Sequence, residues 1–310
     1  MVHFSHPKKL IQIVVFTSIV LACLSCGQKG NSIELDADAK PIKDRIAFAS
    51  ERNGQKHIYS IATDGTDERK LVTTGTGDSE FAWSRDGRYI AFSKDTDNLP
   101  ELFVMNADGS KPQQLTQNMG MVGSPTWSPD GRTIAFHSVG FFSADIYTIS
   151  LDTKAIKRLT KGPGPNTYPH WSPDGKKIAF HAERDDNWEV YVMDADGKNE
   201  KRLTNSPRED WIPSWSPDGK QIAFWSTRNG DWEVYVMDAD GKNQRKISNE
   251  EGRAGGEISR ADWAPDGKSL LISTNPAPKI FNIVQINLEG TLRKDITKPK
   301  GNDYWPIWSP

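Results

Sequence analysis

The stretch Trp171-Ser-Pro-Asp-Gly175 recurs along the sequence in nearly identical copies. Complete copies begin at Trp83, Trp127, Trp171, Trp215 and Trp263, and a truncated copy begins at Trp308. Successive tryptophans are 44, 44, 44, 48 and 45 residues apart. A period of about 40–50 residues is typical of β-propellers, in which each period forms one four-stranded blade. The recurrence of the pentapeptide therefore predicts one closed repeat domain rather than two separate domains of average size.

Residues 168–204 show what a single period contains. Runs rich in β-branched and aromatic residues, at 177–181 and 188–193, are typical of strands. Asp-Gly pairs follow the first strand and the third, and Asp-Gly is a strong signal for a tight hairpin. Proline presets φ in the first of these turns and glycine accepts a positive φ, so the turn sequence has a conformational explanation. We expect four strands per blade, with the tryptophan of the first strand filling the seam between blades.

The two ends of the repeat region complete one another. Residues 45–72 match the second, third and fourth strands of a blade, but no tryptophan strand precedes them. The missing first strand is found at residues 304–310. Together the two segments make one split blade, which closes the ring without an open seam. The sequence thus predicts an all-β, six-bladed β-propeller over residues 44–310, with one blade shared by the N- and C-terminal strands.

The first residues of the chain are typical of an export signal. Two lysines precede an apolar run at 10–24, which is shorter than the ~20 residues that span a bilayer. Val20-Leu-Ala-Cys23 resembles the lipobox of bacterial lipoproteins, so we expect residues 1–23 to be a lipoprotein-type signal with Cys23 as the lipidated residue. Cys26 is an alternative acceptor, and an ordinary cleaved signal is a second alternative. Residues 24–43 are polar and predict a flexible tether.

Composition and motifs argue against several classes of function. The formal net charge of -2 predicts no general attraction to nucleic acid or to anionic lipid. The repeats contain no cysteine, no phosphate loop and no nucleophile elbow. His137 and His181 stand at equivalent places in neighbouring repeats, too far apart to share one metal ion. We expect no cofactor, no metal and no catalytic residue.

Candidate binding residues gather at one predicted end of the propeller. The links between the first and second strands, and between the third and fourth strands, are short Asp-Gly turns. The links at the other end vary in length and sequence, and variable loops on a rigid scaffold commonly carry binding residues. Polar residues stand five positions before a repeat tryptophan and would ring the channel mouth, with aromatic residues beside them. The candidates are Asp78, Asn166, Tyr168, Trp188, Asp210, Trp211, Trp232, Asp303 and Tyr304. An alternative interpretation is that the tryptophans cap blade edges and the acids are solvated loop residues.

The repeat also resembles a known family. Trp-Ser-Pro-Asp-Gly followed by Ile-Ala-Phe, Tyr-Val-Met-Asp-Ala-Asp-Gly and Arg-Leu-Thr is similar to the TolB-type propeller repeat over residues 44–310. The resemblance implies a monomeric binding module of the bacterial cell envelope, with an envelope protein or peptide as partner and the N-terminal lipid as its membrane contact. The alternatives are a hydrolase or lyase with its site around Asp210 at the channel mouth, and a glycan-binding protein. An enzyme needs converging acid, base or metal groups, whereas a binding module needs only an aromatic surface.

Overall fold

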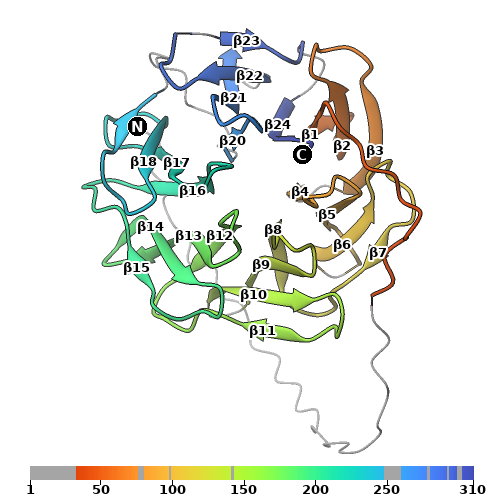
Figure 1. The fold of residues 1–310 in the computed structure, drawn as a ribbon, viewed down its shortest axis with the longest axis horizontal. Helices are drawn as coiled ribbons and strands as arrows, with labels where there is room; N and C mark the ends of the chain where they lie inside the picture. Colours follow the sequence, from red (N-terminus) through yellow and green to blue (C-terminus); the bar gives the residue numbers. More distant parts are fainter. Residues whose placement is uncertain are drawn as a thin grey trace, which may run out of the picture. The chain divides into compact units, whose positions relative to one another are not determined.

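The computed structural model describes residues 33–310 except 76–79, 98, 141–142, 248–259, 278–279, 292 and 299–301, and it does not describe the side chains of residues 275–277, 280 and 293. All secondary structure in the described residues is β. The strands form six four-stranded antiparallel sheets arranged as blades around a central channel (Figure 1). The six-bladed propeller predicted from the repeats is confirmed.

Each blade runs from an inner strand at the channel to an outer strand at the rim (Figure 1). Blade 1 contains β24 (Asn302–Trp308), β1 (Arg45–Arg52), β2 (Gln55–Ala62) and β3 (Arg69–Gly75). Blade 2 contains β4 (Phe81–Trp83), β5 (Tyr89–Lys94), β6 (Glu101–Asn106) and β7 (Gln113–Gln114). Blade 3 contains β8 (Met121–Trp127), β9 (Thr133–Val139), β10 (Ala144–Ser150) and β11 (Ile156–Arg158).

The last three blades repeat the same order. Blade 4 contains β12 (Asn166–Trp171), β13 (Lys177–Arg184), β14 (Asn187–Asp194) and β15 (Lys201–Arg202). Blade 5 contains β16 (Asp210–Trp215), β17 (Gln221–Ser226), β18 (Glu233–Asp238) and β19 (Arg245–Lys246). Blade 6 contains β20 (Asp262–Trp263), β21 (Ser269–Ala277), β22 (Ile280–Asn287) and β23 (Arg293–Asp295).

The split blade is also confirmed. Strand β24, near the end of the chain, pairs antiparallel with β1, near the start of the repeats. Beyond the strands, the Ser309 amide donates to the Arg45 carbonyl oxygen at 2.8 Å, and the Arg45 amide donates to Ser309 Oγ at 3.0 Å. Hydrogen bonds between the two ends therefore hold the ring closed.

The repeated pentapeptide forms a tight, internally bonded turn. Ser172 Oγ donates to Asp174 Oδ1 at 2.6 Å, and the same carboxylate oxygen accepts from the Lys176 amide at 3.0 Å. Gly175 has a φ of 71°, a conformation that costs a glycine nothing because it lacks Cβ. The equivalent serine and aspartate are bonded in the same way in blades 2, 3 and 5. This geometry confirms the conformational interpretation of the turn.

The repeat tryptophans lie in the seams between blades. Trp171 is only 9% exposed, and the phenylalanines of the second strands, such as Phe180, are fully buried. The Trp127 indole of blade 3 donates to the Ala82 carbonyl oxygen of blade 2 at 3.1 Å. Large aromatic side chains bury much apolar area, so these tryptophans carry a large share of the packing energy between blades.

The segment just before the first strand differs from the prediction. Residues 24–43 were expected to be a flexible tether, but those from Ile33 onward lie against blades 2 and 3. The Ile33 amide donates to the Leu151 carbonyl oxygen at 2.9 Å, and Arg88 Nε donates to the Ala39 carbonyl oxygen at 2.7 Å. Ile33 and Ala39 are buried, because even this polar segment has apolar side chains that a propeller surface can cover. We call residues 33–42 the strap.

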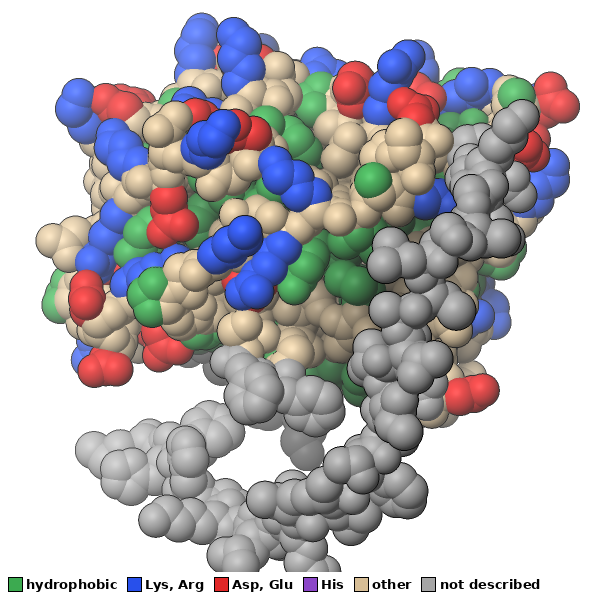
Figure 2. Space-filling view, turned by 90° about the horizontal axis from the view of Figure 1, so that it is seen from below, with side chains coloured by type: hydrophobic (Ala, Val, Ile, Leu, Met, Phe, Trp, Pro, Cys, Tyr) green, Lys and Arg blue, Asp and Glu red, His purple; other side chains and the backbone are tan. Residues whose placement is uncertain are grey.

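The predicted signal segment lies outside the described residues, and so does Cys23. In the part of the chain that the structure describes, no helix has the length and apolar character needed to cross a membrane. Basic and acidic side chains are interspersed over the surface seen in Figure 2, in keeping with the net charge of -2.

Candidate functional site

A group of aromatic rings occupies the end of the channel with the variable links. Tyr168 on β12, Trp188 on β14 and Trp211 on β16 surround the buried His181 of β13. We call these four residues and Trp232, which lies just before β18, the aromatic cluster. The His181 ring centre lies 5.0 Å from that of Tyr168, 4.8 Å from that of Trp188 and 5.0 Å from that of Trp211. Trp232 extends the cluster, with its ring centre 5.4 Å from that of Trp211. The four large rings are half-buried, so each also presents a surface to solvent.

Irregular inner strands direct these rings toward one another. The pairing of β12 with β13 shifts register between Thr167 and His170, and Tyr168 within this bulge has a φ of 53°. A bulge bends its strand and turns a side chain away from the regular alternation. Blade 5 has the corresponding shift, in which Ile212 has a φ of 50°. The bulges bring side chains of two blades into one cluster, which a regular alternation would separate.

His181 holds the bulges in place and is not a free base. Its Nδ1 accepts from the Ile212 amide at 2.9 Å, so Nε2 carries the proton and faces Thr167 Oγ1 at 2.5 Å. Burial, assisted by the nearby His137, lowers the pKa of His181 well below its usual value. Both nitrogens of a neutral imidazole are therefore used for structure.

Tyr304, another predicted binding residue, is buried beside the cluster rather than part of its surface. It is 6% exposed, and its ring lies 5.3 Å from the Lys56 ammonium. Its neighbour Trp305 contacts the cluster instead, with its ring centre 5.7 Å from that of Tyr168. Trp305 is itself only 5% exposed, so its buried ring supports the cluster from the interior of the protein.

The predicted polar ring at the channel mouth is buried. Asn166, Asp210 and Asp303 are all 0% exposed, which differs from both the expected open ring and the solvated alternative. Asp210 Oδ2 accepts from Arg228 Nη2 at 2.8 Å, and Asn166 Oδ1 accepts from Arg184 Nη2 at 2.7 Å. Asp78, the fourth polar candidate, lies outside the described residues.

The arginines extend these contacts into a repeated network. Arg228 donates to Gln244 Oε1 at 2.9 Å, and its guanidinium lies 4.5 Å from the Tyr235 ring centre. Asp303 is the counterpart in blade 1, where it pairs with Arg52, which also bonds Glu68 and lies over Tyr59. Each network joins the inner strand of a blade to the end of its second strand, to its third strand and to the residue just before its outer strand. These networks are built to stabilise blades.

Burial changes the acidity of the carboxyl groups in these networks. Removal from water raises the pKa of Asp210 to about 6, although Arg228 opposes the shift. The pKa of Asp303 is raised in the same direction and for the same reason. Among the described residues, no group of three or more histidine, cysteine, aspartate or glutamate side chains could hold a metal ion.

Sequence reasoning missed a cavity at the opposite end of the channel, where the Asp-Gly turns lie. It encloses about 470 Å³ and is lined by the repeat tryptophans, by residues just before them and by the third residue of each pentapeptide. The turn and the seam between blades explain the composition of the pentapeptide, so its composition does not indicate a cavity. One signal was available: Arg85 stands where the other copies have proline.

Three solved structures show the same fold. TolB from Acinetobacter baumannii is 22% identical with a TM-score of 0.77, over 86% of this chain and 67% of that chain. A putative TolB from Agrobacterium tumefaciens is 21% identical with a TM-score of 0.63, over 86% of this chain and 98% of that chain. Oligogalacturonate lyase in complex with manganese is 16% identical with a TM-score of 0.54, over 84% of this chain and 74% of that chain. At these identities the likeness establishes the fold alone.

A search of curated proteins finds no match. The family model described as the TolB beta propeller domain matches residues 96–310, which is more than half of the chain. Together with the six blades and the repeated turn, this match shows that the chain belongs to the TolB β-propeller domain family.

Proposed function

We propose that this protein is a non-catalytic scaffold of the bacterial cell envelope that binds a protein or peptide at the aromatic cluster. The observation that carries the proposal is the run of half-buried rings Trp188, Trp211 and Trp232 across blades 4 and 5, which Tyr168 joins through the buried His181. Aromatic side chains that are rigidly supported and partly exposed are the residues that dominate protein recognition. The buried His181 and Trp305 supply that support.

The polar groups beside the cluster favour binding over chemistry. Both nitrogens of His181 are engaged, and the Asp210 carboxylate is buried against Arg228. A general acid or base must reach a substrate proton, and neither group reaches an open surface. The hydrolase or lyase alternative would therefore need groups other than these two.

We also propose that the protein is exported, lipidated at Cys23 and monomeric. The apolar run before Cys23 and its lipobox-like sequence support export and lipidation. Because the strap is fixed to blades 2 and 3, any free spacer between lipid and propeller would have to lie before Ile33.

Capture from envelope extracts tests the proposed surface. The full chain and its Trp211→Ala and Trp232→Ala variants would be cross-linked in detergent-solubilised envelopes, and bound proteins quantified by mass spectrometry. Loss of one anchor residue commonly costs ~2 kcal/mol, so we expect a partner to fall by about 30-fold in at least one variant. Ile156→Ala is the matched control, because Ile156 is an exposed apolar residue on the outer strand β11.

Three results separate the alternatives. Retention of every partner by both tryptophan variants, with melting temperatures unchanged, would reject the aromatic cluster as the binding surface. Capture that disappears after digestion of envelope glycans would assign the same surface to glycan binding, since sugars also pack on aromatic rings. A partner lost equally in Ile156→Ala would point to a surface on blade 3.

A further inference from the structure

The cavity at the Asp-Gly end of the channel is lined mainly by apolar side chains. The six repeat tryptophans and the prolines of five pentapeptides line it, so most of the wall is apolar. The rim prolines Pro217, Pro265 and Pro310 are exposed and rigid, so this part of the entrance is bounded by side chains with little freedom to move. A volume of about 470 Å³ falls within the range of small-molecule sites.

Polar groups enter this wall where the repeats differ from one another. The residue just before the tryptophan is His170 in blade 4 and Asp262 in blade 6, whereas it is alanine, threonine or isoleucine at the other positions that line the cavity. Arg260 lines the cavity from just before β20, and Arg85 replaces the pentapeptide proline in blade 2. These four polar residues come from blades 2, 4 and 6, so alternate blades contribute them to an otherwise repetitive ring.

Arg260 is the least satisfied of these groups. Its side chain is 6% exposed, and in the described part of the chain its buried Nε has no hydrogen-bond partner. Asp262 Oδ1 lies 3.9 Å from Arg260 Nε, and the Trp305 ring centre lies 5.8 Å from the guanidinium. Burial lowers the pKa of Arg260, which reflects the cost of a charge removed from water.

The acids near Arg260 are only partial counter-charges. Asp262 Oδ2 is engaged by the Trp308 amide at 2.9 Å, and burial raises the pKa of Asp262 to about 6. The negative charge of Glu80 also favours the charged form of Arg260 and raises its pKa. Glu80 does not line the cavity, however, and its carboxylate accepts a hydrogen bond from Ser124 Oγ at 2.8 Å. Among the described residues, no carboxylate accepts a hydrogen bond from the Nε donor of Arg260.

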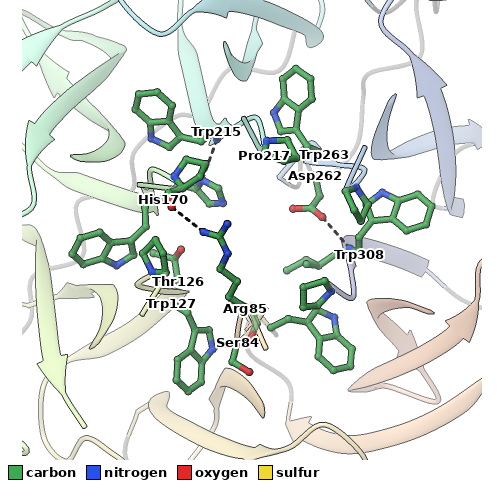
Figure 3. Close-up of a pocket in the computed structure, with 18 of the residues that line it drawn as sticks. Ser84, Arg85, Thr126, Trp127, His170, Trp215, Pro217, Asp262, Trp263 and Trp308 are labelled. Carbon is green, nitrogen blue, oxygen red and sulfur yellow. Dashed lines mark hydrogen bonds between the residues drawn. The ribbon is translucent and has the colours of Figure 1, made fainter. Parts of the chain in front are cut away.

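Two further donors converge on the same space. Arg85 is exposed and its side chain extends across the cavity to donate to the Pro173 carbonyl oxygen at 2.8 Å (Figure 3). His170 Nδ1 accepts from the Trp215 amide at 3.0 Å, so the proton of the neutral ring lies on Nε2. Burial and the positive Arg260 lower the pKa of His170 well below its usual value, so it offers a hydrogen bond rather than a charge.

The charges of the described lining side chains select the ligand. Two arginines face one aspartate, which leaves an excess of one positive charge, and the walls around them are apolar. We propose that this cavity binds a small organic carboxylate, with its carboxylate on Arg260 and Arg85 and its apolar part against the tryptophan and proline walls. Arginine pairs with carboxylate through two parallel hydrogen bonds, which suits a buried guanidinium whose Nε has no hydrogen-bond partner among the described residues. This site is separate from the aromatic cluster and does not depend on the proposed partner.

Binding of matched acids and amides tests this site. The full chain, labelled with ¹⁵N-tryptophan, would be titrated with acetate, phenylacetate and indole-3-acetate and with the three corresponding amides, while indole N–H resonances are followed by NMR. We expect saturable shifts with phenylacetate or indole-3-acetate, and binding at least about tenfold weaker for the amide, because a hydrogen bond to a charged group is lost. Inorganic phosphate, titrated in parallel, shows whether any anion suffices.

Three variants locate the carboxylate. Arg260→Gln should remove the preference for acid over amide, and Arg85→Gln, at an exposed position, should weaken acid binding several-fold. Arg132→Gln, in the corresponding turn region of blade 3 but outside the cavity, should bind as wild type. The proposal would be overturned by equal affinity for acid and amide, by absence of saturable binding for all three acids, or by unchanged binding in both cavity variants. Stronger binding of phosphate than of any carboxylate would also overturn it.

Discussion

Replacing Asp210 by asparagine should change how the stability of the protein depends on pH. Asp210 and Asn166 occupy the same position in blades 5 and 4, and each accepts a hydrogen bond from an arginine 18 residues later. Asp210→Asn thus copies an arrangement that blade 4 already contains. The variant keeps an acceptor for Arg228 and removes a carboxyl group that is fully buried.

The magnitude follows from the shifted acidity. The pKa of Asp210 is about 6 in the folded protein, against an ordinary value of 3.8. A carboxyl with a raised pKa stabilises the fold fully below the unfolded pKa, and that contribution is lost as pH rises through the folded pKa. A shift of about two units corresponds to ~3 kcal/mol of unfolding free energy. The unfolding free energy of wild type should fall by this amount between about pH 4 and about pH 7 because of Asp210. The variant should show no such loss from position 210.

Chemical denaturation at a series of pH values measures the effect. Unfolding free energies of wild type and Asp210→Asn would be compared from about pH 4 to about pH 8, and the variant should gain ~3 kcal/mol relative to wild type across this range. Asp262 and Asp303 also have raised pKa values, but both proteins contain them, so the difference isolates Asp210. Asn166→Asp is the reverse control and should acquire a new loss of stability above about pH 6. A difference between Asp210→Asn and wild type that stays constant with pH would refute the reasoning.

Three other changes test the fold and the N-terminus. Trp171→Ala should lower the unfolding free energy by ~3–5 kcal/mol, because Trp171 is 9% exposed in a seam; an unchanged melting temperature would contradict its place there. Deletion of residues 304–310 removes most of β24 and should abolish cooperative thermal unfolding by circular dichroism, whereas a truncated protein that melts like wild type would exclude the split-blade closure. Cys23→Ser should abolish incorporation of labelled fatty acid while Cys26→Ser retains it, and the opposite pattern would move the acceptor to Cys26.

The fold could be predicted from sequence because its determinants are local and repeated. Tryptophan spacing gave the blade count, and the Ser-Pro-Asp-Gly turn is stabilised by bonds between residues two apart, such as that between Ser172 and Asp174. The split blade was predictable for the same reason, since residues 45–72 and 304–310 each match a known part of the repeat. None of these inferences needs knowledge of long-range contacts.

The roles of the candidate residues depend on contacts that the repeat pattern does not show. Asp210 looked accessible because it follows a variable link, yet its partner Arg228 lies in another link of the same blade. The presence of an arginine 18 residues after both Asn166 and Asp210 could have indicated the pairing. Cavity residues such as Arg260 were missed because the cavity forms only when all six blades meet.

The pairing of β24 with β1 has a consequence for how the chain could be connected. In the ring, Pro310 and Asp44 stand where the other blades have a continuous Trp-Ser-Pro-Asp-Gly turn, and the neighbouring Ser309 and Arg45 are already hydrogen-bonded. A short Asp-Gly link that joins Pro310 to Asp44 would restore that turn. The polypeptide could then be reopened at another blade's turn, such as Asp174-Gly175, giving a circular permutant with the same blades. The order of strands along the chain and their order around the ring are thus separable properties of this protein.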